Sequence, residues 1–258
     1  MKLVDAHCHF DFPRFDGHRA SELEAALRSG VVGLVIPGVR RADWGRVQSA
    51  ALAHNGLYYC LGIHPWYVSE HSTRDLEALE ANLSARPERC IAIGECGLDR
   101  LHGDLAEQYP WFEAQIELAL KLGFPLVIHS VKTHDEVHAT LRRRNWSGKA
   151  LLHGFSGSYQ QASKLVDQGC FVGVGGVITH PRAHKTRETI ARLPLESLVL
   201  ETDAPDMAPE GIAAGYNSPA YLPRIFECLA DIRCEQPEYL ASVLFSNTAE
   251  LYGRSLWQ

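Results

Sequence analysis

Long apolar runs are missing from this sequence. No stretch approaches the roughly 18 consecutive apolar residues that a membrane-spanning helix requires, and His7 and His9 come before any signal-type apolar segment develops. The seven cysteines form no Cys-x-x-Cys pair and most lie in apolar runs, which disfavours a disulfide framework or a zinc ribbon. We therefore expect a cytoplasmic protein with reduced thiols, no membrane partner and no obligate protein partner.

An excess of basic residues is missing as well. The chain has 25 lysines and arginines against 31 aspartates and glutamates, for a net charge of -6. This balance excludes a generally basic nucleic-acid surface, but it leaves room for a local patch or for bound metal ions as the source of positive charge. The one concentrated basic run, residues 142–144, is expected to lie at a helix C-terminus rather than on DNA.

The sequence does contain a series of short apolar runs separated by amphipathic segments. This alternation is typical of repeated βα units and a parallel sheet. Boundary signals support two of the helices: Ser21 is a possible cap for one that stops at Gly30, and Gly123 ends another. The eight runs are residues 3–9, 31–37, 57–64, 90–95, 125–129, 150–153, 170–177 and 198–203.

Eight strands in about 250 residues is the count of a (β/α)8 TIM barrel. We therefore predict an α/β fold in a single domain over residues 1–258, because no repeat beyond the βα unit and no flexible linker interrupts the chain. The alternative is a doubly wound open sheet. That fold favours a phosphate-binding G-x-G-x-x-G after the first strand, whereas the nearest match, "VGVGG", falls in the seventh run.

Polar residues follow the apolar runs at their carboxyl ends, where barrel active sites lie. His7 and His9 are two residues apart and should face the same way, with Cys8 opposite, because strand side chains alternate. The full set is His7, His9, His64, Glu95, His129, His153 and Asp203. The other histidines, among them His102 and His134, are expected to be solvated, while His180 lies close enough to the mouth to be a candidate substrate contact.

A single histidine at a strand end is usually no ligand, but this many at one barrel mouth indicate a metal centre. Four histidines and two carboxylates exceed what one tetrahedral zinc needs. They suit two divalent cations about 3.5–4 Å apart, with Glu95 as the bridging group. Imidazole ligands favour Zn, Mn, Fe or Ni, and a weakly held Mg is a further candidate.

The ordered motifs "DAHCHFDF", "GIHP", "IGECGLD", "VIHS", "LLHGFSGS", "LETDAP", "NSP" and "SNTAELYG" cover nearly the whole chain. As a set they resemble the TatD family of metal-dependent hydrolases in the amidohydrolase superfamily. The resemblance implies a (β/α)8 barrel with two divalent ions and a metal-dependent DNase activity, often 3′ to 5′ exonucleolytic. It also implies that His7, His9, Glu95 and Asp203 bind one ion and that Glu95, His129 and His153 bind the other.

The sequence departs from the family where many members have an arginine two residues after the histidine of the fifth strand. Here that position is Val131, which removes an expected phosphate contact. Lys132 and Arg100 are candidates to replace it, although a lysine cannot bind a phosphate through two parallel donors as an arginine does. An interpretation of both residues as ordinary charges at the rim is equally compatible with the sequence. Ser156 and Ser158 in "HGFSGS" are further candidate phosphate donors, although small residues also simply form tight loops.

The expected chemistry is hydrolysis by a metal-activated water. Asp203 would orient that water and accept its proton, and Glu95 would hold both ions. His64 would contact the scissile phosphate or the leaving oxygen, with a purely supporting role as the alternative. Glu201 lies one layer deeper on the face of Asp203 and is expected to support it.

Three functional classes are compatible with these residues. The first is a deoxyribonuclease. The second is a hydrolase of the same superfamily that acts on a small metabolite ester, amide or phosphoester, or on an aminoacyl ester. The third, a metal-binding protein without turnover, is disfavoured because structural sites saturate their ligands around one ion.

Overall fold

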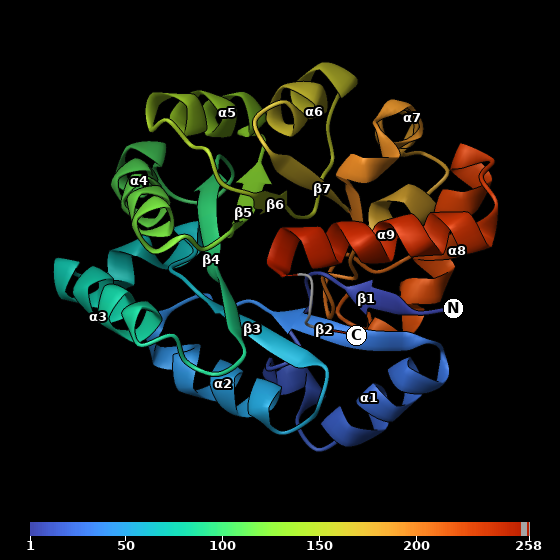
Figure 1. The fold of residues 1–258 in the computed structure, drawn as a ribbon, viewed down its shortest axis with the longest axis horizontal. Coiled ribbons are helices and arrows are strands. Elements are labelled where there is room, and N and C mark those ends of the chain that lie inside the picture. The colour runs from blue at the N-terminus through green and yellow to red at the C-terminus, as the bar shows by residue number, and fades with distance from the viewer. Residues whose placement is uncertain (254–256, 258) are drawn as a thin grey trace.

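Eight strands, each parallel to the next, follow one another in chain order in the computed structural model, which describes residues 1–253 and 257 (Figure 1). Backbone hydrogen bonds close the ring: Ala6 N donates to Leu200 O and Asp203 N donates to His7 O, both over 2.9 Å. The prediction of a TIM barrel is confirmed, and the open doubly wound sheet is wrong. The strands are β1 (Leu3–Asp5), β2 (Val31–Ile36), β3 (Leu57–Leu61), β4 (Cys90–Asp99), β5 (Leu126–Val131), β6 (Ala150–Leu152), β7 (Cys170–Val174) and β8 (Leu198–Leu200).

Helices form an outer layer around the strands (Figure 1). They are α1 (Arg19–Arg28), α2 (Trp44–Leu52), α3 (Thr73–Ser84), α4 (Leu105–Leu122), α5 (His134–Arg143), α6 (Tyr159–Val166), α7 (His184–Arg192), α8 (Leu222–Arg233) and α9 (Pro237–Tyr252). Short 3-10 turns lie in the connections: η1 (Pro13–Phe15), η2 (Arg41–Asp43), η3 (Pro65–Glu70), η4 (Gly176–Thr179), η5 (Leu195–Ser197) and η6 (Pro219–Tyr221).

The helix boundaries agree with the sequence signals at some positions and not at others. Gly123 ends α4 in the left-handed region at φ 68°, as predicted. Arg142 and Arg143 lie in the last turn of α5, also as predicted. The Ser21 cap was wrong: α1 already begins at Arg19, and the Ser21 hydroxyl donates to the carbonyl of His18 from inside the first turn.

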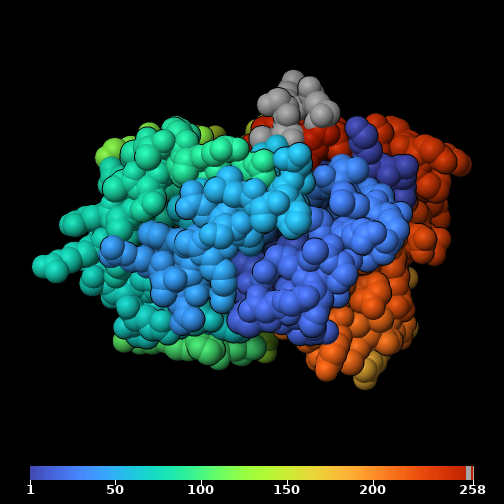
Figure 2. All heavy atoms as spheres, turned by 90° about the horizontal axis from the view of Figure 1, so that it is seen from below, coloured from blue at the N-terminus to red at the C-terminus, as the bar shows by residue number. Residues whose placement is uncertain are grey.

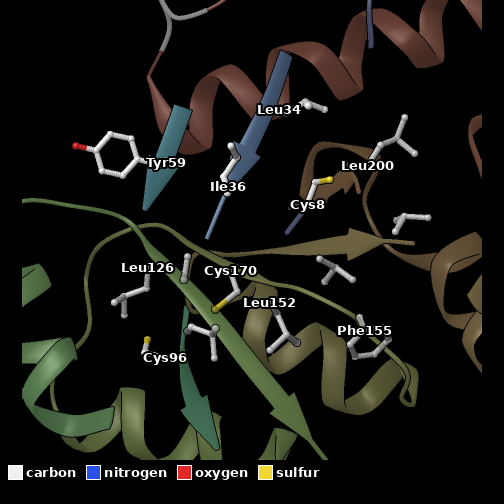
Figure 3. Close-up of a cluster of buried hydrophobic side chains, with 14 of the residues drawn as sticks. Cys8, Leu34, Ile36, Tyr59, Cys96, Leu126, Leu152, Phe155, Cys170 and Leu200 are labelled. Carbon is white, nitrogen blue, oxygen red and sulfur yellow. The ribbon is translucent and has the colours of Figure 1, made fainter. Parts of the chain in front are cut away.

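Strand side chains alternate between two apolar layers. Leu34, Leu126 and Leu200 point outward into the cluster between strands and helices (Figure 3). Their chain neighbours Val35, Val127 and Val199 fill the barrel interior, as the two-residue period of a strand requires. Residues that continue the inward face past the apolar layers therefore reach the carboxyl-end mouth of the barrel.

The opposite end of the barrel is filled by apolar side chains from the end of the described chain. Leu251, Tyr252 and Trp257 join the interior cluster. Trp257 Nε1 donates to Gly56 O, just before β3 begins. Figure 2 shows the N-terminal segments in blue packed beside the C-terminal ones in orange and red. None of the described helices is both long and apolar enough to cross a membrane.

Candidate metal centre

The carboxyl ends of six strands bring the predicted polar side chains together. Glu95 lies within β4 and His129 within β5, and His153 follows β6 directly. The remaining four lie in the turns that follow β1, β3 and β8. All seven side chains are buried: His7, His9, His64, Glu95, His129, His153 and Asp203.

The two carboxylate oxygens of Glu95 face two different groups of histidines. Oε1 lies 3.0 Å from His129 Nδ1 and 2.7 Å from His153 Nε2. Oε2 lies 3.4 Å from the Nε2 atoms of both His7 and His9. A carboxylate placed in this way has one oxygen for each of two neighbouring cations.

Asp203 completes the group around His7 and His9. Its Oδ1 lies 3.2 Å from His7 Nε2 and 3.5 Å from His9 Nε2. His153 Nδ1 is farther from the same oxygen, at 4.0 Å. Asp203 also has φ 55°, a left-handed conformation that costs a non-glycine residue energy and is often found at functional sites.

Two buried carboxylate oxygens in this cluster have no hydrogen-bond donor among the described residues. They are Glu95 Oε2 and Asp203 Oδ1, and both face the nitrogens of His7 and His9. Buried carboxylates are normally satisfied by hydrogen bonds or cations. Three sets of ligand atoms lie close enough to hold an ion, namely His7 with His9 and Glu95, His7 with His153 and Asp203, and His64 with Glu95 and His129. The residues present therefore fit bound divalent cations.

The electrostatics of the cluster favour bound positive charge. Burial alone would raise the pKa of Glu95, but the surrounding histidines, His153 first, hold that pKa well below its usual range. Burial would lower the pKa of His7, but Glu95 and Asp203 outweigh it and raise that pKa well above its usual range. The carboxylates thus stay ionised and draw cations towards them.

His64 differs from the other histidines in its hydrogen bonds. Its Nδ1 accepts from the backbone N–H of Trp66 over 3.1 Å, which places the ring proton on Nε2. That Nε2 lies 3.1 Å from Glu95 Oε1. Burial lowers the pKa of His64 to about 4, so the ring is neutral at neutral pH. A neutral ring with its proton on Nε2 is a hydrogen-bond donor to Glu95 Oε1, so His64 could join Glu95 and His129 as a metal ligand only if that proton left Nε2.

Sequence reasoning assigned no role to Asp99, which supports His129 from behind. Its Oδ2 lies 3.0 Å from His129 Nε2 and accepts from Trp66 Nε1 over 2.6 Å. Burial would raise the pKa of Asp99, but the hydrogen bonds from His129 and Trp66 outweigh it and lower the pKa to about 2. The available signal was spacing, because Asp99 lies four residues beyond Glu95, an even interval along one strand.

An open cavity of about 260 Å³ lies over the cluster. Apart from the histidines and carboxylates of the cluster, Asp206 and six largely apolar residues line it: Phe12, Val39, Trp66, Tyr67, Val131 and Met207. Among the described residues, no lysine or arginine belongs to this lining.

The predicted substrate contacts lie outside that lining. Arg100 pairs with Glu136 and donates through Nε to the backbone oxygen of Lys132, which is itself exposed. Ser158 caps α6 in a reciprocal hydrogen-bonded box. The hydroxyl of Ser156 lies 3.4 Å from that of Thr186. Contacts of a longer substrate with the four predicted residues stay predictions; these residues are Arg100, Lys132, Ser156 and Ser158.

The positions of three other polar residues can be compared with the predictions made from the sequence. His180 lies outside the cavity lining, with Nε2 3.0 Å from the carbonyl of Ala208. Glu201 is fully buried below Asp203 and accepts a hydrogen bond from Gly154 N over 2.6 Å. This position agrees with the prediction that Glu201 supports Asp203. The expectation that His134 is solvated was wrong, because its Nδ1 contacts Ser130 Oγ at 2.6 Å and the ring is buried.

A parallel barrel with buried histidines and carboxylates at its carboxyl-end mouth defines a metal-dependent hydrolase of the barrel class. The family model described as TatD related DNase matches residues 4–253. The chain therefore belongs to the TatD family of metal-dependent hydrolases.

Individual relatives cover almost the full length. The uncharacterized metal-dependent hydrolase YjjV of Escherichia coli K12 is 41% identical over 98% of each chain. The crystal structure of that TatD homologue has a TM-score of 0.93 and covers 97% of each chain. A Klebsiella pneumoniae protein named 3′-5′ ssDNA/RNA exonuclease TatD is 34% identical over 97% of this chain and 98% of its own.

Proposed function

We propose that this enzyme is a metal-dependent 3′ to 5′ exonuclease that hydrolyses phosphodiester bonds in single-stranded DNA. The observation that carries the proposal is the division of the histidines between the two oxygens of Glu95, which suits a two-cation phosphodiesterase. Relatives that bear the name 3′-5′ ssDNA/RNA exonuclease TatD support the substrate class. A cavity of about 260 Å³ also suits a chain end better than an intact duplex.

The proposed ligands fall into two groups around Glu95. His7, His9 and Asp203 would hold one divalent ion with Glu95 Oε2, and His129 and His153 would hold the other with Oε1. The nitrogen-rich donor set favours Zn, Mn, Fe or Ni, with Mg as a weaker candidate. Ions bound there would supply a water of lowered pKa and offset the charge that develops on phosphoryl oxygens.

The chain's own side chains then handle protons and orientation. The histidines around Asp203, His7 first, overcome the effect of burial and lower its pKa, so its carboxylate is ionised at neutral pH. It can orient the attacking water and accept its proton. His64 would donate from Nε2 to a phosphoryl or leaving oxygen. His64→Ala should therefore lower turnover while the content of bound metal stays unchanged.

The test uses end-labelled single-stranded DNA and protein reconstituted with Mg, Mn, Co or Zn. Wild type should shorten the strand from its 3′ end, and a chelator should stop the reaction reversibly. Asp203→Asn keeps the shape of the side chain but removes the base, so turnover should fall by about 10²-fold or more. Equal residual activity in both proteins would show a contaminating nuclease, and activity with none of the metals would overturn the proposal.

The cavity itself favours a second candidate, a hydrolase of a small ester, amide or phosphoester. Its volume of about 260 Å³ is small, and among the described residues its lining has no lysine or arginine to hold a polyanion. A screen of the same metal-loaded protein against phosphomonoesters, aminoacyl esters and amides distinguishes the two. Turnover there without any on DNA would favour this candidate.

We also propose that residues 1–258 form one functional domain that works in the cytoplasm without an obligate protein partner. The seven cysteines are free thiols and five of them are buried, which suits a reducing compartment. Subcellular fractionation tests the compartment, and light scattering of the purified protein tests whether the chain stays in solution without a partner.

A further inference from the structure

Trp66 is a large apolar side chain held partly in solvent at the wall of the cavity. Trp66 is 44% exposed, whereas the neighbouring His64 is only 5% exposed. Indole rings are usually well buried, so an exposed one in the wall of a ligand cavity calls for a physical reason.

The ring is fixed in place by contacts that leave it little freedom. Its Nε1 donates to Asp99 Oδ2 over 2.6 Å. The ring of His102 stacks against it with centroids 4.7 Å apart and an interplanar angle of 21°. Its backbone N–H donates to His64 Nδ1, which places the residue directly beside the metal centre. A rigid aromatic surface loses little conformational entropy when a ligand binds to it.

The remainder of the cavity narrows the choice of ligand group. Phe12, Val131 and Met207 add apolar surface to the wall, and the described lining holds no lysine or arginine. No lysine or arginine of the described lining is therefore available to form an ion pair with a substrate phosphate. The aromatic and apolar wall can instead bind a flat apolar group, and the π-face of every nucleobase is such a group.

We propose that Trp66, supported by His102, is the stacking surface for the nucleobase of the 3′-terminal nucleotide. The inference rests on the exonuclease function proposed above. It assigns recognition of the chain end to aromatic stacking instead of to ion pairs with the backbone. It also places the stacked base next to His64, so that the adjoining phosphate can reach the centre around Glu95.

The test is a double-mutant cycle between the enzyme and the substrate. Wild type and Trp66→Ala act on two oligonucleotides that differ only in whether the 3′-terminal nucleotide carries its base or is abasic. On the natural end, Trp66→Ala should lower kcat/KM by about 5- to 150-fold, the range for loss of one base–aromatic stack. On the abasic end, wild type should already be slow, and Trp66→Ala should cause little further loss.

Two variants separate stacking from other effects. Trp66→Phe keeps an aromatic face but loses the hydrogen bond to Asp99, so it should retain most of the preference for a natural end. Leu101→Ala truncates another exposed apolar side chain of a nearby loop that lies outside the cavity lining, and it should behave as wild type. Metal content is measured for every variant.

The outcomes are distinct. A loss in Trp66→Ala that is equal on natural and abasic ends would overturn the stacking role while the exonuclease function stands. Loss of bound metal in Trp66→Phe together with loss of turnover would show that Trp66 acts through Asp99, which also overturns it. If wild type cleaves neither oligonucleotide, the proposed function fails and this inference falls with it.

Discussion

Replacing Asp99 with asparagine should weaken one of the two proposed metal sites and leave the other intact. The Asp99 carboxylate can only accept hydrogen bonds, so it keeps the proton of His129 on Nε2, 3.0 Å away. Nδ1 of His129 faces Glu95 Oε1 and His153 Nε2, and its lone pair becomes available to a metal ion once Nδ1 has released its own proton. Metal binding by Nδ1 requires this tautomer.

An asparagine at this position has one acceptor oxygen for three donors. Leu101 N and Trp66 Nε1 also donate to Asp99, so the amide NH2 of the variant is turned towards at least one of its neighbours. If that NH2 donates to His129 Nε2, the ring proton moves to Nδ1 and blocks the metal-binding atom. Loss of such a supporting partner typically costs 10- to 100-fold in metal affinity, about 1.4–2.7 kcal/mol.

Stepwise titration of metal-free protein with Zn against a fluorescent chelator measures the two affinities separately. One constant should weaken by 10- to 100-fold and the other should change little. Asp104→Asn is the matched control, because Asp104 only caps α4 and its replacement is a good capping residue too. Unfolding midpoints show whether the variants stay folded at the titration temperature. Equal weakening of both constants, or no weakening of either, would refute the tautomer argument.

Three further measurements test the centre. Metal analysis should give close to two ions per chain, with Glu95→Ala weakening both sites and His153→Ala mainly one; a single ion unaffected by Glu95→Ala would contradict the bridging role. Metal binding should release protons, because burial lowers the pKa of His129 but Asp99 and Glu95 raise it to about 9, so the metal-free ring is protonated at neutral pH. Affinity should then strengthen as pH rises towards about 9, by up to about tenfold per unit for that proton, and calorimetry in buffers of different ionisation enthalpy would reveal no release if this is wrong. Val131→Arg places a cation in the cavity wall and should lower KM for DNA with a steeper dependence on salt; an unchanged KM would show that the phosphate lies elsewhere.

The sequence alone determined the barrel and the direction of many site residues. The two-residue period of a strand carries Val127 and His129 to the same inward face, and the same period relates Leu151 to His153. His7 and His9 also point into the site together, although β1 has ended at Asp5. Such features depend on local geometry and the burial of apolar side chains, which the order of residues encodes directly.

Tertiary structure decided how the site is assembled. The division of the histidines between the two oxygens of Glu95 depends on the relative placement of strands far apart in the chain. The partnership of Asp99 with Trp66 and His129 arises in the same way. The start of α1 and the directions of Arg100 and Ser158 also escaped local reasoning, because loop conformations and hydrogen-bond partners are set by contacts between distant segments. A short local pattern specifies which way a backbone turns, but only the closed barrel specifies which side chains meet.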